Sequence, residues 1–324
     1  MAGAEAGAEA GVVAGVEVVE YTDPLCPWSW GAEPVLRRLR AESAGRVRWR
    51  RVYAVMFDHD DDPPPDPAAE TAWYTRYVAG VTEHTGAPCA ARLSRVAASS
   101  WPASLVAEAA ARQGAEVGEA VLRRLRETVF VLGEPADTLP LALAAARGVP
   151  GLDPRRLAAD AASPQVLRQV RADREEARRP VPEVLAGQTG SPHPGRAKET
   201  ADGGHRYALP TLLLRAPAGH RAVPGWRSYE EYAAAFDAVR PGLLAGAARL
   251  PAAAALERYR SLTDPERLLL AEGSWPPPGA VRVPTGNGPL WLHPAEAAQH
   301  PAAPGTAGPP VPPGPPNETS KGVH

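Results

Sequence analysis

Cys26 and Pro27 lie where a strand-like segment meets a helix-like segment, and this junction restricts the folds open to the chain. The segment VEVVEYTD, residues 16–23, is rich in β-branched and aromatic residues and predicts a strand. Apolar residues then recur at helical spacing from residue 28, and residues 46–56 alternate apolar and basic side chains as a second strand does. The order strand, helix, strand favours a parallel β-α-β unit and therefore an α/β protein.

The rest of the chain shows a helical block followed by further strands. Residues 73–179 carry apolar residues at helical spacing without a strand-like run, and Asp137 is the predicted N-cap of one helix in this block. Strand signals return in residues 208–219 and 220–225. Near the C-terminus, the pair Asn287–Gly288 predicts the turn of a short hairpin.

These signals divide the chain into six segments. We expect a disordered leader over 1–14, an N-terminal β-α-β unit over 15–60, a helical insertion over 61–190, a β-β-α unit over 191–242, a small helix-and-hairpin appendage over 243–300 that docks on or caps the rest, and a disordered proline-rich tail over 301–324.

Composition and charge exclude several classes of protein. The 324 residues carry a formal net charge of -2, which gives no electrostatic basis for a nucleic-acid partner. No apolar run reaches the ~18 residues that a membrane-spanning helix needs, so we expect no membrane partner. Two cysteines exclude a disulfide-stapled scaffold and a cysteine-rich zinc module. The N-terminus lacks the pattern of a secretory signal, which favours a cytoplasmic protein with reduced thiols.

The position of Cys26 is the main functional signal. A sulfur at a helix N-terminus faces unpaired N–H groups and the positive end of the helix dipole, which stabilise the thiolate and predict a lowered pKa. Pro27 presets the first helical turn, and Ser29 lies where its hydroxyl can donate to the sulfur. On spacing alone, a buried and inert Cys26 is an equally good interpretation.

The run TDPLCPWSWGAEPVLRRL, residues 22–39, resembles the active-site region of the DsbA-like branch of the thioredoxin superfamily, especially its FrnE-type and Spx-adaptor-type cytosolic members. The Cys-Pro-x-x motif between strand and helix, the proline at Pro34 within the helix, and the helical block carry the resemblance over about residues 16–240. The resemblance implies a thioredoxin-like α/β fold with a DsbA-type all-helical insertion and a small C-terminal α/β appendage.

The same resemblance implies a substrate site. In this family a cis-proline begins the strand after the helical block and faces the reactive cysteine, and Pro210 matches that position. The backbone before such a proline can pair with a peptide as an extra strand, which assigns substrate binding to Leu209. We therefore expect Cys26 and Ser29 to carry the chemistry, and Pro27, Trp28, Leu209 and Pro210 to bind substrate.

The motif departs from the family at its second position. The usual Cys-x-x-Cys ends here in Ser29, and a disulfide oxidant needs the second sulfur to release the mixed disulfide, so we expect no dithiol oxidase. Cys89, in the helical block, is expected to be a buried free cysteine and not a resolving thiol.

Three hypotheses on function remain. One is a thiol-dependent oxidoreductase or isomerase that acts through Cys26 alone, on a protein, peptide or small thiol, with glutathione as a candidate co-substrate. The second is a non-catalytic thioredoxin-fold adaptor that binds a protein partner. The third is a kappa-type glutathione transferase or isomerase, whose family has serine at the first motif position. No resident cofactor is expected.

Other residues carry weaker signals. The acidic run Asp58–Asp62 lacks the spacing of a calcium loop and predicts a solvated loop, not a metal site. His193 and His205 precede Pro210 in the sequence. Each of them either lines the site or is an exposed loop histidine. Trp28 is expected at the mouth of the site and Trp30 in the core. A further helical set is expected to be core: Tyr74, Tyr77 and Val81.

Overall fold

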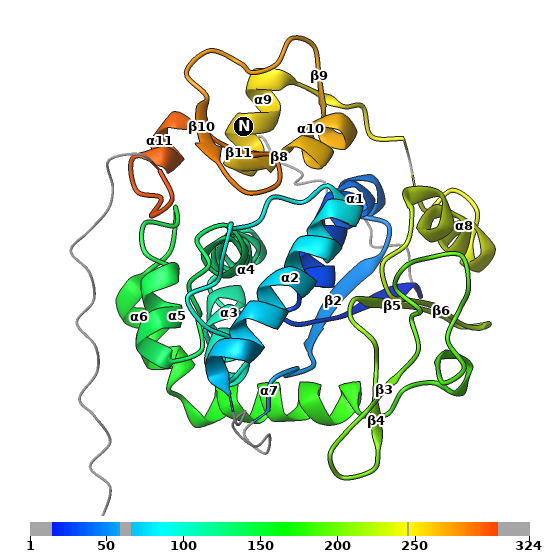
Figure 1. Cartoon of the computed structure of the whole chain (residues 1–324). Coiled ribbons are helices and arrows are strands. Elements are labelled where there is room, and N and C mark those ends of the chain that lie inside the picture. The colour runs from blue at the N-terminus through cyan, green and yellow to red at the C-terminus, as the bar shows by residue number, and fades with distance from the viewer. Residues whose placement is uncertain (1–14, 59–65, 245, 304–324) are drawn as a thin grey trace, which may run out of the picture.

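The computed structural model describes residues 15–58, 66–244 and 246–303. The expected leader, most of the acidic run and the tail from residue 304 lie outside these residues. Figure 1 shows a central sheet flanked by helices, with the C-terminal elements forming a cap on one side. No helix in the described ranges is long and apolar enough to cross a bilayer.

Four strands form the central sheet in the order β2-β1-β5-β6. They are β1 (Glu17–Thr22), β2 (Arg48–Tyr53), β5 (Thr211–Ala216) and β6 (Gly219–Pro224). Strands β1 and β2 are parallel and are joined by helix α1 (Pro27–Ser43), which confirms the predicted β-α-β unit. Strand β5 runs antiparallel to both β1 and β6, so the sheet is mixed.

Different segments cover the two faces of this sheet. Helix α1 and helix α8 (Tyr229–Val239) bury apolar residues such as Leu36 and Phe236 against one face. On the other face, the end of α7 and the segment that follows it pack residues such as Val184 and Tyr207 against β1 and β5. Cys26 belongs to this second apolar cluster.

The helical block is confirmed. It comprises α2 (Pro67–Thr85), α3 (Trp101–Ala111), α4 (Ala115–Phe130), α5 (Leu139–Ala145), α6 (Pro154–Ala161) and α7 (Pro164–Ala177), with no described strand among them. Two details differ from the sequence-based expectation. The first helix begins at Pro67, because Asp66 caps its first turn, and residues 86–100 are not helical. The N-cap of α5 is Thr138, whereas the buried Asp137 binds Arg95 and the Ala98 N–H.

A one-turn 3-10 helix, η1 (Pro182–Val184), and a short antiparallel hairpin lead back to the sheet. The hairpin consists of β3 (Lys198–Glu199) and β4 (His205–Arg206), in which Lys198 lies opposite Arg206. The chain then passes Leu209 and Pro210 and enters β5. The hairpin therefore lies immediately before the predicted site.

The C-terminal part is built from short elements. They are β7 (Leu250–Pro251), α9 (Ala252–Tyr259), β8 (Ser261–Thr263), α10 (Asp264–Leu270), β9 (Ala271–Glu272), β10 (Val281–Pro284), β11 (Pro289–Leu292) and α11 (Pro294–Ala297). The predicted hairpin around Asn287–Gly288 is confirmed by the pairing of β10 with β11. Strand β8, which the sequence did not predict, pairs with β11.

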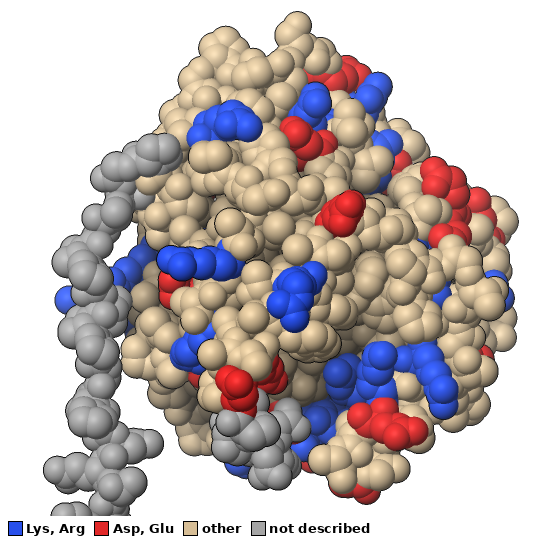
Figure 2. Space-filling view, in the orientation of Figure 1, with Lys and Arg blue, Asp and Glu red and all other residues tan. Residues whose placement is uncertain are grey.

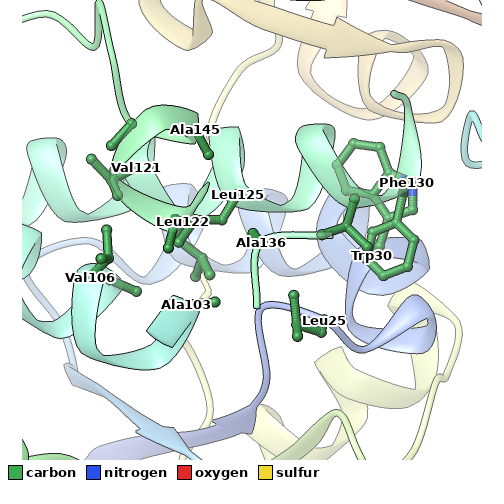
Figure 3. Packing of buried hydrophobic residues seen from close by; sticks show 14 of the residues in the cluster. Leu25, Trp30, Ala103, Val106, Val121, Leu122, Leu125, Phe130, Ala136 and Ala145 are labelled. Carbon is green, nitrogen blue, oxygen red and sulfur yellow. The ribbon is translucent and has the colours of Figure 1, made fainter. Parts of the chain in front are cut away.

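The C-terminal elements share a core with the helical block. Val283 and Leu290 belong to the same apolar cluster as Leu25, Trp30 and Phe130. Figure 3 shows Trp30 beside Phe130, with Leu25 next to them and the α4 residues further along. This shared core fits the expected docking role, and the domain boundaries themselves stay predictions.

Candidate functional site

Cys26 is the N-cap residue of α1, directly after β1. Its side chain is only 3% exposed, and its Sγ donates to the backbone carbonyl of Leu209 at 3.7 Å. The Leu209–Pro210 peptide bond is cis. The structure therefore brings Cys26 against Leu209 and Pro210, as the resemblance implied, although the sulfur is covered.

The expected low pKa of Cys26 is wrong. Burial raises the pKa of the thiol above its ordinary value, because the charged thiolate loses its solvation. Ser29 and Arg206 lower the pKa and Asp23 raises it further, and the net direction remains upward. The favourable effect of the first helical turn, through Ser29, is thus smaller than the effect of burial. The thiol is therefore protonated at neutral pH.

Ser29 lies beside the sulfur, as its spacing predicted. Its hydroxyl and its backbone N–H both lower the pKa of Cys26. The Ser29 Oγ is fully buried and has no well-formed hydrogen bond to any described residue. Ser29 therefore only partly offsets the rise in the pKa of Cys26 that burial causes.

Aromatic residues of α2 lie near Cys26. Trp28 Nε1 donates to the Tyr77 hydroxyl at 2.8 Å, which ties the start of α1 to α2. Burial raises the pKa of Tyr74 and of Tyr77, and Cys26 raises each further, which places both phenols near the sulfur. Tyr74 and Val81 are buried as predicted, but Tyr77 is 39% exposed and is not a core residue. Trp30 is in the core and Trp28 is half-buried at the surface.

His193 also lies at this site. Its ring meets the Trp28 ring edge-on, with centroids 5.0 Å apart. His193 Nδ1 accepts from the Gly195 N–H at 2.9 Å, so the hydrogen of the neutral ring is on Nε2. Burial lowers the pKa of His193 to about 4, and the ring is therefore neutral at pH 7. His205, the other histidine considered, is half-buried in β4.

A positively charged side of the site was not recognised from the sequence. Arg206, four residues before Pro210, lowers the pKa of both Cys26 and Tyr77. Lys198 lowers the pKa of His193, after the larger effect of burial. Figure 2 shows Lys and Arg side chains gathered over the β3–β4 region, beside a hollow in the surface. The pattern of basic residues just before a candidate cis-proline was the available signal.

The other candidates lie elsewhere or form no site. Cys89 is a buried free cysteine, in the apolar cluster of the helical block and not in that of Cys26. Within the described residues, no three His, Cys, Asp or Glu side chains are placed to hold a metal ion. Asp58, the described end of the acidic run, binds Arg174 at 2.6 Å and Arg178 at 2.9 Å. A cavity of about 710 Å³ between Arg92 and Gly286 contains none of the residues discussed at the Cys26 site.

Comparisons with known proteins agree with this architecture. A family model described as thioredoxin matches residues 20–179. The ClpXP adapter protein SpxH of Shouchella clausii is 32% identical over 161 residues, covering 49% of this chain and 52% of that protein. SpxH of Halalkalibacterium halodurans is 28% identical over 165 residues, covering 49% of this chain and 53% of that protein. The chain thus spans about half the length of the curated relatives it matches.

A solved structure from Nitrosomonas europaea, provisionally assigned as a protein disulfide isomerase, is similar in fold. Its TM-score is 0.53 at 16% identity, and the match covers 69% of this chain and 97% of that one. The matched family model, the SpxH relatives and the observed strand-helix order all point to the same superfamily. Together they support a DsbA-like chain of the thioredoxin superfamily, matched to the thioredoxin family model over residues 20–179.

Proposed function

We propose that the chain is an adaptor of the DsbA-like branch, which binds an extended segment of a partner protein next to Cys26 and runs no dithiol redox cycle. The observation that carries the proposal is a buried, protonated thiol beside exposed aromatic side chains. A catalytic thiol needs the thiolate, which burial of Cys26 disfavours. Ser29 also removes the second sulfur that a dithiol oxidant requires.

An aromatic strip at the surface supports the binding of a partner. The strip consists of Trp28, Trp73, Tyr77, His84 and Trp226. Trp73 is 56% exposed and stacks on Tyr77 with 5.7 Å between ring centroids, while His84 lies edge-on to Trp226 at 4.8 Å. Large aromatic side chains that remain exposed together are typical of protein-interaction surfaces.

The relatives support the same proposal. The two SpxH proteins carry the description ClpXP adapter protein, and each matches about half of this chain. The proposed partner is accordingly a protein segment, bound along the backbone before Pro210 and along the aromatic strip. A cytoplasmic location belongs to the same proposal.

Single-cysteine thiol exchange is the second candidate function. Ser29 and Arg206 both lower the pKa of Cys26, which favours some thiolate and a mixed disulfide with a partner thiol or glutathione. The kappa-type alternative stays a prediction from the motif, and no contact described above favours it over the other two.

The rate of alkylation of Cys26 by iodoacetamide, followed against pH, tests the choice between adaptor and enzyme. A Cys89→Ala background leaves Cys26 as the only thiol. We expect a midpoint above the ordinary value of about 8.5, because burial disfavours the thiolate. Ser29→Ala should raise the midpoint slightly, because the Ser29 side chain lowers the pKa of Cys26. A wild-type midpoint below 7 would refute the adaptor proposal and favour the enzyme.

Selection from a displayed random peptide library tests binding directly. We expect the chain to enrich peptides that Cys26→Ser retains and that the double variant Trp28→Ala/Tyr77→Ala loses. An enzyme that works through a mixed disulfide would lose its captured peptides in Cys26→Ser. Failure to enrich any peptide over the double variant would also count against the adaptor.

A further inference from the structure

We propose that the proline-rich run PPVPPGPP, residues 309–316, binds to the aromatic strip of its own chain and competes there with a partner segment. The inference rests on the proposed function for the surface that the two occupants share. Three features of the molecule support it: the shape of the strip, the hydrogen-bond donors on it, and the distance that the C-terminal residues can span.

One face of α2 presents a row of rings with a gap in it. Trp73, Tyr77 and His84 follow one another at spacings of four and seven residues, so they share a face of the helix, on the near side of the molecule in Figure 1. Gly80 lies between them on this face, and a Cβ added there would meet no atom within 4 Å. The gap between the rings is therefore open.

The length of this row suits an extended proline segment. Eleven residues separate Trp73 from His84, which is about 16 Å along a helix axis. Five to six residues of polyproline II, at ~3.1 Å each, cover that distance. A run of eight residues with six prolines is long enough to lie along the whole row.

The rings continue beyond α2 without a break. The Trp28 ring lies 6.3 Å from that of His84, and the His84 ring meets the Trp226 ring edge-on at 4.8 Å. Aromatic surfaces of this kind bind proline-rich segments, because proline rings pack against the aromatic faces and the polyproline II backbone loses little entropy on binding.

The hydrogen-bond donors of the strip match the acceptors of such a segment. Prolines have no backbone N–H, so a proline-rich run offers mainly carbonyl acceptors. The Tyr77 hydroxyl accepts from Trp28 Nε1 at 2.8 Å and keeps its own hydrogen to donate. Trp73 is 56% exposed, and its Nε1–H has no acceptor among the described residues. Both donors can therefore bind proline carbonyls.

The last described residues are held close to the strip. His300 is buried, and its Nε2 lies 2.8 Å from Glu127 Oε2 on α4. One helical turn later, Phe130 stacks on Trp30 with 6.2 Å between ring centroids, and Trp30 follows Trp28 by two residues. This series of contacts limits the distance from His300 to Trp28 to roughly 30 Å.

The chain beyond Ala303 is long enough to cover that distance. Pro309 and Pro316 follow Ala303 by 6 and 13 residues. At ~3.1 Å per residue, the run therefore lies between roughly 20 and 40 Å from its attachment point. Attachment to the same chain also gives the run an effective concentration on the order of 1 mM at the strip, which makes even weak binding effective.

Fluorine NMR of the full chain labelled with 5-fluorotryptophan tests this contact directly. The variant Pro310→Ser/Pro312→Ser/Pro313→Ser/Pro315→Ser keeps the length of the chain and removes the proline character of the run. We expect the Trp73 and Trp226 signals to shift in this variant, whereas the signal of Trp30, which is buried in the core, stays in place. Unchanged Trp73 and Trp226 signals would overturn the inference.

A second pair of variants tests the gap at Gly80. Gly80→Leu fills the gap, so the proline substitutions should no longer shift the strip signals in that background. Ala159→Leu is the matched control, because it adds the same side chain at an exposed position of α6 outside the strip, and it should leave the shifts intact. Dilution of the wild type should change nothing, and loss of the shifts on dilution would overturn binding within one chain.

The peptide library separates the two proposals. Captured peptides should bind roughly two- to tenfold more tightly to the proline variant than to wild type, because a competitor at about 1 mM effective concentration has been removed. Peptides that bind both equally, with unshifted tryptophan signals, would overturn this inference and leave the adaptor proposal standing. Shifted signals without any captured peptide would refute the adaptor and support binding of the run to the strip.

Discussion

Glu266 joins the C-terminal elements to the thioredoxin-like part, and its charge can be removed almost without change of shape. The side chain is fully buried on α10. It accepts from Arg123 of α4 at 2.8 and 2.9 Å and from Arg37 of α1 at 3.0 Å. In Glu266→Gln these two guanidinium groups lose a shared counter-charge in a position shielded from water.

The expected loss of stability follows from these contacts. Removing one partner of a buried ion pair typically costs about 3–5 kcal/mol, because the other charge stays buried. Arg123 keeps a second carboxylate, Glu127, at 2.6 Å from its Nε. We therefore expect Glu266→Gln to lower the free energy of unfolding by an amount near the lower limit, about 3 kcal/mol.

Equilibrium unfolding in urea, followed by circular dichroism and by tryptophan fluorescence, measures this loss. Glu272→Gln is the matched control, because Glu272 is exposed on β9 and makes no ion pair within the described chain. The control should change stability by less than about 0.5 kcal/mol. If Glu266→Gln were as stable as Glu272→Gln, the ion pairs would not hold the C-terminal elements in place.

Three further predictions concern single groups. Burial raises the pKa of Asp173 to about 7, so the stability that its neutral form supports is present below pH 4 and is lost as the pH rises through 7. Relative to wild type, Asp173→Asn should gain on the order of 4 kcal/mol of unfolding free energy in urea between pH 4 and pH 8. The same pH dependence in the variant and in wild type would contradict this. The ring of His193 should titrate by NMR near pH 4, and the stability linked to it is present above pH 6.5 and lost as the pH falls towards 4; a midpoint near 6.5 would show that the ring is not buried. In Gly31→Ala the new Cβ would lie 2.6 Å from Thr85 Cγ2, which should cost roughly 1–3 kcal/mol in thermal unfolding, whereas Gly80→Ala on the open face of α2 should stabilise by up to about 1 kcal/mol.

The secondary structure near the site was predictable because it depends on local signals. Alternating residues predicted β1 and β2, helical spacing predicted α1, and a β-branched and leucine-rich run predicted β5. Short elements were harder. Strand β8 has three residues and exists because β11 supplies its hydrogen-bond partners, so its own sequence gives little indication of it.

The burial of several arginines could not be predicted from the sequence, because charged residues are normally expected at the surface. Arg123, Arg124 and Arg126 of α4 are almost fully buried, and each is matched by a carboxylate from a distant part of the chain. The helical pattern of α4 predicts one apolar face, but it cannot show that its other face is covered too. Only the fold brings Glu33, Glu266 and Glu296 to that face.

The sign of the pKa shift at Cys26 depends on a competition that sequence spacing cannot decide. The favourable effect of a helix N-terminus is typically 0.3–1 kcal/mol and reaches about 2 kcal/mol in partly buried geometries. Burial of an ionisable group can shift its pKa by several pH units, and each unit corresponds to 1.36 kcal/mol. The residues packed with Cys26 include Leu209, 183 residues further along the chain. The motif therefore determines where the thiol lies, whereas burial determines how easily it ionises. In this chain burial has the larger effect on the pKa of Cys26.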